Sequence, residues 1–229
     1  MPSVYHTVRP GDTLSRIGKL YGIPWPTIAE LNGLVSPYVI HVGEILIIRN
    51  DAITAEPTYL LVDGPWTANS DPTPFRKQWI IVHDPGTTGV PLERITTAVR
   101  LSRNPRVSYH EILGEVNGKA VINRLVPYDR AAWHAGARSR IPGTTIVESA
   151  VNYRTYGLCV NYPMVEKLYP VLVARLCDLV ERFAMPDAGV ILAHHEVATQ
   201  RHDPRLPGGR TMTDLRRSVH DELLRRQVD

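Results

Sequence analysis

Cysteine is scarce in this chain, since only Cys159 and Cys177 among its 229 residues carry a thiol. Two cysteines cannot form a disulfide framework, and both lie in apolar segments, so we expect buried free thiols. Long hydrophobic runs are missing as well, which argues against a membrane-spanning helix and against insertion into a membrane. The first residues lack a basic start followed by an apolar segment, so the sequence predicts no signal peptide.

An excess of one charge sign is also absent. The 26 Lys and Arg residues stand against 23 Asp and Glu, giving a formal charge of +3 and an isoelectric point near 8.9. This mild basicity favours contact with an anionic polymer but is too weak to indicate nucleic-acid binding. Hydrophobic residues make up 43% and charged residues 21%, the composition of an ordinary soluble protein with one large or two smaller domains.

Residues 4–49 have the pattern of a self-contained unit in the order strand, helix, helix, strand. The segment V-Y-H-T-V alternates like a strand and leads into the turn P-G-D-T-L. Asp12 or Thr13 can cap the helix that follows, and Gly22 is placed to end it. A second short helix has Pro26 in its first turn, and E-I-L-I-I-R closes the unit as a strand.

The stretch V-Y-H-T-V-R-P-G-D-T-L-S-R-I-G-K-L-Y-G-I, with the later E-L-N and V-G-E-I-L-I-I, resembles the LysM module over essentially its whole length. LysM modules bind chitin or peptidoglycan through N-acetylglucosamine units. The resemblance implies a glycan-binding groove between the first strand–helix turn and the loop after the second helix. The residues implied are Gly11, Asp12, Thr13, Leu14, Asn32, Gly33 and Leu34. Several of them are turn and cap residues as well, and the backbone that they shape would form the groove.

Residues 51–77 are rich in Pro, Asp, Asn and Thr, which is typical of a linker. We therefore divide the chain into a glycan-binding module at 1–50, a linker with an N-terminal extension at 51–77, and a second domain at 78–229. Apolar residues in the extension, Tyr59, Leu60, Leu61 and Trp66, are expected to pack on the second domain.

From residue 78 onward, strand and helix patterns are mixed. The segments S-Y-H-E-I-L and A-V-I-N-R-L are joined by E-V-N-G-K, which carries the Asn-Gly signal of a β-hairpin. The longest helix is expected between Val165 and Met185, and an amphipathic helix ends the chain. The pattern predicts an α/β fold with a mixed β-sheet flanked by helices, preceded by the small βααβ domain.

Histidines stand at two predicted strand ends, His83 in W-I-I-V-H and His194 in V-I-L-A-H, and His134 lies in A-W-H-A-G. A zinc hydrolase needs about three protein ligands and one open position, and strand ends hold ligands rigidly. The segment L-A-H-H-E-V-A-T-Q-R-H-D-P, at 192–204, adds further metal-ligand side chains. From the residues alone, a metal site and ordinary polar roles stay equally open.

The segments W-I-I-V-H-D, V-S-Y-H-E-I-L, A-W-H-A-G, N-Y-R-T-Y-G-L-C-V and L-A-H-H-E-V-A-T-Q-R-H-D-P resemble, in this order, the type 2 N-acetylmuramoyl-L-alanine amidases. These share their fold with phage amidase lysins and animal peptidoglycan recognition proteins. The resemblance runs from about residue 78 to the C-terminus. It implies a Zn2+ site formed by His83, His194 and Asp203. It also implies hydrolysis of the amide between the lactyl group and L-alanine in peptidoglycan.

Two features of the last motif depart from relatives. His202 stands beside Asp203 and is the alternative third ligand, although D-P matches the family motif and favours Asp203. Arg201 stands where many relatives have Lys; Arg stays protonated, so it cannot act as a base but can stabilise an oxyanion. His195 is expected to point the other way on its strand and to pack or to support the ligands.

The resemblance also assigns roles around the metal. Tyr109 matches a Tyr near the metal-bound water, and His134 matches a His that hydrogen-bonds the substrate or the oxyanion. Glu111 is expected to share a strand face with Tyr109 and is a weaker candidate for the base.

The alternative hypothesis is a peptidoglycan-binding protein that keeps the fold without catalysis. The complete set of implied ligands favours the enzyme. The expected partner is peptidoglycan, with its glycan and stem peptide, and not nucleic acid. The missing signal peptide fits a phage or prophage endolysin that stays in the host cytoplasm until release and then acts on the cell wall. A bacterial autolysin exported by another route has the same features.

Overall fold

The computed structural model describes residues 4–32, 34–49, 59–102 and 107–227. The chain divides into two compact units, Met1–Pro57 and Thr58–Asp229. The boundary falls inside the stretch assigned above to a linker, so the residues from Thr58 onward group with the second unit.

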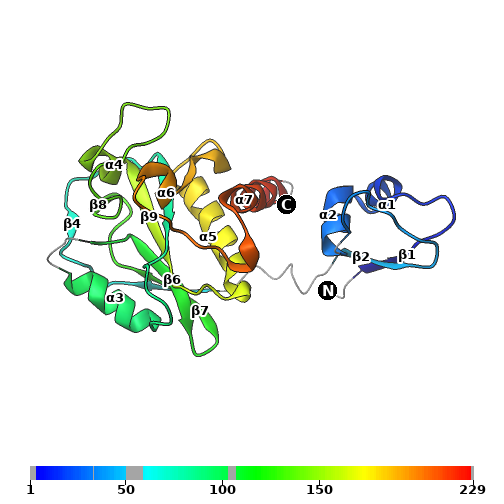
Figure 1. Ribbon diagram of the computed structural model, residues 1–229, viewed down its shortest axis with the longest axis horizontal. Coiled ribbons are helices and arrows are strands. Elements are labelled where there is room, and N and C mark those ends of the chain that lie inside the picture. Colours follow the sequence, from blue (N-terminus) through cyan, green and yellow to red (C-terminus); the bar gives the residue numbers. More distant parts are fainter. Residues whose placement is uncertain (1–3, 33, 50–58, 103–106, 228–229) are drawn as a thin grey trace. The chain divides into compact units, whose positions relative to one another are not determined.

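The first unit has the predicted βααβ order (Figure 1): β1 (Val4–Thr7), α1 (Leu14–Tyr21), α2 (Trp25–Leu31) and β2 (Ile45–Arg49). The two strands pair antiparallel, and both helices bury their apolar residues against them. The hydroxyl of Thr13 accepts the N–H of Arg16, so Thr13 caps α1. Gly22 ends this helix with φ 68°, a left-handed conformation that suits glycine.

The second unit is built on a six-stranded sheet in the order β10-β5-β9-β6-β7-β3. Its strands are β3 (Tyr59–Asp63), β5 (Trp79–His83), β6 (Glu111–Val116), β7 (Lys119–Arg124), β9 (Thr155–Val160) and β10 (Ile191–Ala193). Only β6 and β7 pair antiparallel, through the expected hairpin with Asn117 and Gly118 at positive φ. A small second sheet joins β4 (Ser70–Asp71) to β8 (Ala131–Ala132). The mixed sheet predicted from the sequence is confirmed.

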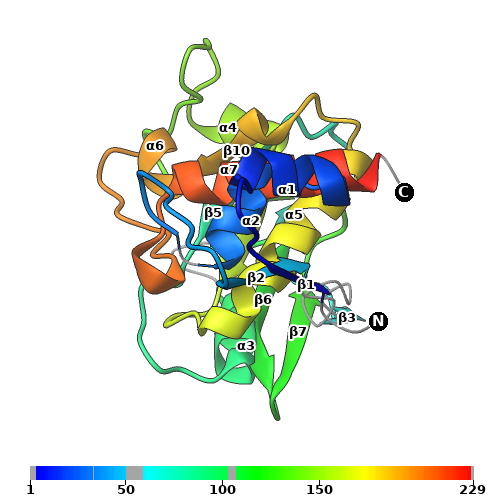
Figure 2. The ribbon, with the colours of Figure 1, turned by 90° about the vertical axis from the view of Figure 1, so that its right-hand side faces the viewer.

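Helices cover both faces of this sheet. The helices are α3 (Leu92–Leu101), α4 (Ser149–Arg154), α5 (Tyr169–Arg182), α6 (His194–Val197) and α7 (Met212–Arg226), with short 3-10 turns at Glu166–Leu168, Ala188–Val190 and Pro207–Gly209. Figures 1 and 2 show α5 and α7 side by side, and both contribute to the largest core cluster with Ile80 and Val82. The alternate residue Ile81 packs on the other face, against Val151 of α4 and Val197 of α6.

Three local expectations were wrong. One concerns the extension: Tyr59 and Leu61 pack on the core of the second unit as expected, in an edge strand that pairs parallel with β7, but Leu60 and Trp66 are exposed. The longest described helix is α7, with 15 residues, because α5 begins only at Tyr169, after the extended Val165, and ends at Arg182. His195 lies in the short helix α6 rather than on a strand, because β10 ends at Ala193.

Lys77 is a buried cation just before β5, with 1% of its surface exposed. Its Nζ donates to the carbonyl oxygen of Tyr153 at 3.2 Å, and burial lowers the pKa of this amine from 10.5 to about 7. Between these two pH values the unfolded chain binds a proton that the folded chain lacks. Stability should therefore rise with pH in this window, and the cost of burying the charge is fully present below about pH 7.

We expect Lys77→Met to be more stable than the wild type by on the order of 3 kcal/mol near neutral pH, because an apolar side chain of similar length has no charge to desolvate. The difference should shrink toward zero as the pH approaches 10. Urea unfolding of both proteins at about pH 6.5 and about pH 9.5 measures it, and the other titrating groups cancel in the comparison. An equal difference at both pH values would contradict this account.

Candidate metal centre and catalytic cleft

The site is assembled where β5 and β10 end side by side. These strands pair parallel, with Ala193 opposite Val82, so the residues that follow, His194 and His83, become neighbours. Their ring centroids lie 4.3 Å apart, and both side chains are buried. Carboxyl ends of parallel strands are the usual place for ligand sites in such sheets.

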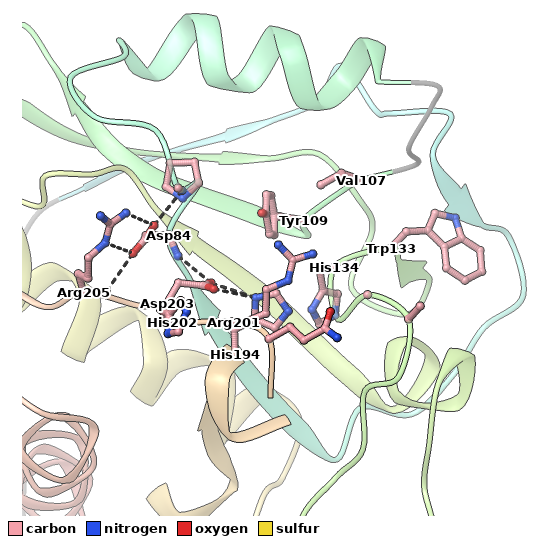
Figure 3. A pocket seen from close by; sticks show the side chains of 15 residues that line it. Asp84, Val107, Tyr109, Trp133, His134, His194, Arg201, His202, Asp203 and Arg205 are labelled. Atoms are coloured by element: carbon pink, nitrogen blue, oxygen red, sulfur yellow. Dashed lines mark hydrogen bonds and ion pairs between the residues drawn. The ribbon is translucent and has the colours of Figure 1, made fainter. Parts of the chain in front are cut away.

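Asp203 reaches the same point from the loop after α6. Its two carboxylate oxygens each lie 3.0 Å from Nδ1 of His194, and Oδ2 lies 3.4 Å from Nδ1 of His83. The donor atoms of these three residues all lie within 4.8 Å of one another. Figure 3 shows His194 and Asp203 facing each other at the floor of the cleft.

These three residues fit a zinc ion. Nδ1 of His83 is buried and has no hydrogen-bond partner among the described residues, and burial lowers the pKa of His83 to about 4. The imidazole is therefore neutral at pH 7 and can offer a lone pair. Burial opposes ionisation of Asp203, but the contacts of its carboxylate with His194 and His83 outweigh this effect and lower the pKa of Asp203, so the carboxylate is charged. Two imidazole nitrogens and one carboxylate oxygen, with one side open, form a typical catalytic zinc donor set.

Two residues that the sequence analysis did not single out, Asp84 and Arg205, hold Asp203 in place. The backbone N–H of Asp84 donates to Oδ2 of Asp203 at 3.3 Å. The carboxylate of Asp84 in turn accepts two hydrogen bonds from the guanidinium of Arg205, at 2.9 and 2.7 Å, and this guanidinium lies over the ring of Tyr162. His195, for which packing or support of the ligands was expected, also contacts Asp203: its backbone N–H donates to the carbonyl oxygen of Asp203 at 3.2 Å, and its Nδ1 lies 3.1 Å from the same oxygen. In the sequence, His83-Asp84 and Asp203-Pro204-Arg205 were the segments that could have indicated these contacts.

A cleft of about 710 Å³ is lined by His194 and Asp203, while His83 is fully buried beside them. Tyr109 and Arg201 both line it, as expected, and Figure 3 shows them on the side away from Arg205. The ring of Tyr109 lies 5.1 Å from that of His83, and burial raises the pKa of its hydroxyl well above 10, so this group stays a proton donor. The guanidinium of Arg201 is exposed and has no hydrogen-bond or ion-pair partner within the described parts of the chain.

Glu111 does not lie in the cleft. It is fully buried, and its carboxylate forms a double hydrogen bond with Arg175 of α5 on the opposite face of the sheet. The expectation that Glu111 shares a face with Tyr109 was wrong, because β6 begins only at Glu111 and the chain bends at His110. This removes Glu111 as a candidate base.

His134 borders the cleft but is only 4% exposed, and both of its ring nitrogens have partners. Nδ1 lies 3.0 Å from Nε2 of His83, and Nε2 lies 3.1 Å from the hydroxyl of Thr155. The expected hydrogen bond from His134 to substrate or oxyanion is therefore not available in this arrangement. His202 is exposed at the rim, and it is not part of the donor group that the structure brings together.

In the first unit, the side chains implied in glycan binding shape the loops. Asp12 accepts the N–H of Arg9 at 2.8 Å and contacts Nε2 of His6 at 2.7 Å. The side chain of Asn32 bridges to the backbone of Ile28 and Ile47.

The other implied positions differ in exposure. Leu14 is buried in the core, Leu34 is partly buried against it, and Gly11 has φ 84° in the turn before α1. Gly33 lies outside the described residues.

Comparisons with known proteins agree with these observations. The profile of the LysM domain matches residues 6–49, and that of the N-acetylmuramoyl-L-alanine amidase family matches residues 73–206. A search among curated proteins finds no match. No helix within the described ranges has the length and apolar character needed to cross a bilayer.

Solved structures share the fold at low sequence identity. A Staphylococcus aureus hydrolase, AmiA, in complex with its ligand, is 11% identical over 79% of this chain and 94% of its own, with a TM-score of 0.55. The catalytic domain of XlyA is 16% identical over 71% of this chain and 99% of its own, with a TM-score of 0.51. A mutant endolysin from Bacillus subtilis is 15% identical over 71% and 98%, with a TM-score of 0.50. With a family profile covering more than half of its length, the chain belongs to the N-acetylmuramoyl-L-alanine amidase family and carries a LysM domain ahead of the amidase domain.

Proposed function

We propose that this protein is a zinc-dependent N-acetylmuramoyl-L-alanine amidase that hydrolyses the amide between the lactyl group of N-acetylmuramic acid and L-alanine in peptidoglycan. One observation carries the proposal: His83, His194 and Asp203 bring two imidazole nitrogens and a carboxylate together, and His194 and Asp203 line an open cleft. This donor set suits a catalytic metal, because a fourth position stays open to the substrate.

Zinc bound by these residues would polarise the scissile carbonyl and lower the pKa of water toward about 7. Tyr109 would orient that water, because its hydroxyl stays protonated and its ring packs beside His83. Arg201 offers a permanently charged guanidinium to the negative charge that develops on the carbonyl oxygen. Asp84 and Arg205 keep the carboxylate of Asp203 in its orientation.

The LysM domain would bind the glycan strands of the same polymer. Holding the enzyme on an insoluble substrate raises the local concentration of scissile amides without changing the chemistry. The formal charge of +3 favours approach to an anionic wall.

Chemical analysis of digested peptidoglycan tests the reaction. We expect purified enzyme loaded with zinc to release new L-alanine amino groups and no new reducing sugars, because amide and not glycosidic bonds are cleaved. About one zinc per chain should accompany the activity. Binding to peptidoglycan without any released amino groups would identify a recognition protein instead of an enzyme.

Substitutions that leave the three ligands intact should separate chemistry from metal binding. We expect Arg201→Ala to lower kcat by about 10²-fold or more, as for the loss of one oxyanion donor, and Tyr109→Phe to lower it in the same direction. Zinc content should stay at the wild-type level in both. Kinetics with a soluble muramyl peptide, together with metal analysis, provide the measurement. Unchanged kcat in both variants would remove these roles.

We further propose that the protein acts as a phage or prophage endolysin, since one structure of the same fold is an endolysin by name. Expression inside a bacterial host should then cause lysis only when a membrane-permeabilising protein is co-expressed. Routine appearance of the protein outside intact, uninfected cells would instead indicate an exported autolysin.

A further inference from the structure

We infer that the segment His134–Ala135, anchored by Asn152 of α4, orients both proposed metal-binding histidines through the ring nitrogens that face away from the metal. This inference rests on the proposed zinc site. It assigns no contact with substrate to these residues, so we describe them as positioning residues.

The first contact concerns His83. If Nδ1 of His83 offers its lone pair to a metal, the ring proton must sit on Nε2, which lies 3.0 Å from Nδ1 of His134. Nε2 of His83 then donates to Nδ1 of His134, and His134 must carry its own proton on Nε2. That atom lies 3.1 Å from the hydroxyl of Thr155, which donates onward to the carbonyl oxygen of Val151 at 2.7 Å. Each donor in this series of hydrogen bonds has one acceptor, so only one direction of donation satisfies every member of the series.

The second contact concerns His194. Its Nε2 lies 3.2 Å from the carbonyl oxygen of Ala135. When Nδ1 of His194 binds a metal beside Asp203, the ring proton must sit on Nε2, and the carbonyl oxygen of Ala135 lies where it can accept that proton. Adjacent residues of one short segment thus offer acceptors to Nε2 of both histidines.

Asn152 holds this segment in place. Its Oδ1 accepts the backbone N–H of His134 and the backbone N–H of Ala135, both at 2.9 Å, and the side chain is 5% exposed. Gly157 of β9 allows the ring of His134 to approach the sheet closely, because a Cβ at this position would come within 2.6 Å of the ring. Hydrogen bonds to the ring nitrogens that do not bind the metal fix the orientation of the ligands and contribute to metal affinity.

Zinc affinity, measured by competition with a chromophoric chelator on the full chain, tests the inference without relying on catalysis. His134→Asn and His134→Gln form a matched pair. The Asn amide can place an acceptor near the position of Nδ1, whereas the Gln amide reaches the position of Nε2 and leaves His83 without its acceptor. We expect His134→Gln to bind zinc about 10–100-fold more weakly than the wild type, and His134→Asn to recover most of that loss.

Thr155→Val is the second variant, because it keeps the shape of the side chain and removes only its hydrogen bonds. Thr155→Val should also weaken zinc binding, by a smaller factor than His134→Gln. If His134→Gln does not fold, the zinc affinity of Thr155→Val alone tests the inference. The unfolding midpoints of the metal-free proteins separate a local effect on affinity from general loss of stability. Wild-type affinity in both His134→Gln and Thr155→Val would overturn this inference and leave the zinc site intact. Failure of the wild type itself to bind zinc would overturn the proposed function, and this inference with it.

Discussion

Asp203→Ala is expected to lose its zinc and to lower amidase activity by at least about 10³-fold. Asp203 is the only carboxylate in the donor group found in the described residues, and it contacts Nδ1 of both histidines. Without it, two imidazoles remain, which is one ligand short of a catalytic zinc site. The Lewis acid would be lost, and with it the several kcal/mol of transition-state stabilisation that it supplies.

His202→Ala is the matched control, because His202 is the neighbouring residue and was the alternative third ligand. It is exposed and lies outside the donor group, so this variant should keep about one zinc per chain. Metal analysis and amino-group release, measured on both variants, distinguish the two assignments. Loss of zinc in His202→Ala, with zinc retained in Asp203→Ala, would reverse them.

The same Asp203→Ala protein should still bind insoluble peptidoglycan. The LysM domain lies in a separate compact unit with its own core, so removal of a metal ligand in the second unit leaves it unchanged. A sedimentation assay with purified cell walls measures this directly. A variant that neither binds nor cleaves would indicate that the substitution had damaged the whole protein.

Arg175→Met is expected to destabilise the amidase domain by about 3–5 kcal/mol, since it leaves the carboxylate of Glu111 buried without its partner. Arg175 and Glu111 are both buried, and the guanidinium donates from two nitrogens to the two carboxylate oxygens, Nε at 2.9 Å. The same guanidinium also donates to the hydroxyls of Tyr128 at 2.8 Å and Tyr59 at 3.3 Å. This cluster joins α5 to β6 and to the edge strand β3.

The double variant Arg175→Met with Glu111→Leu should recover most of the lost stability, because a buried ion pair and an apolar pair of similar volume are often nearly equivalent. Urea unfolding of the wild type, the single variant and the double variant gives the coupling energy. Equal losses in the single and double variants would show that the charge left behind is not the source of the effect. Recovery of stability in the double variant would also support a structural role for Glu111. If Glu111 were a catalytic base instead, its replacement would lower activity without restoring the stability lost in Arg175→Met.

Much of the architecture could be predicted from local sequence. The hairpin at Asn117–Gly118, the cap at Thr13 and the strand ending at His83 all depend on near neighbours in the chain. The proposed ligands were also accessible to sequence reasoning, since His83 follows one apolar strand and His194 another, and Asp203 precedes a proline in a family motif. Periodicity and turn chemistry carry this information because they act over a few residues.

Only the tertiary structure decided what those side chains meet. In the structure, Glu111 pairs with Arg175, and both ring nitrogens of His134 contact side chains of the protein. The side chain of Asn152 hydrogen-bonds the segment that contacts both histidines. The tertiary structure also placed Tyr59–Asp63, from which the sequence predicted only packing on the second domain, in a strand paired with β7. These outcomes depend on contacts between residues far apart in the chain, such as Glu111 and Arg175, which are separated by 64 in the residue numbering. Local patterns show which face a residue prefers, but the partner that satisfies a buried polar group is selected only when the sheet and its helices pack together.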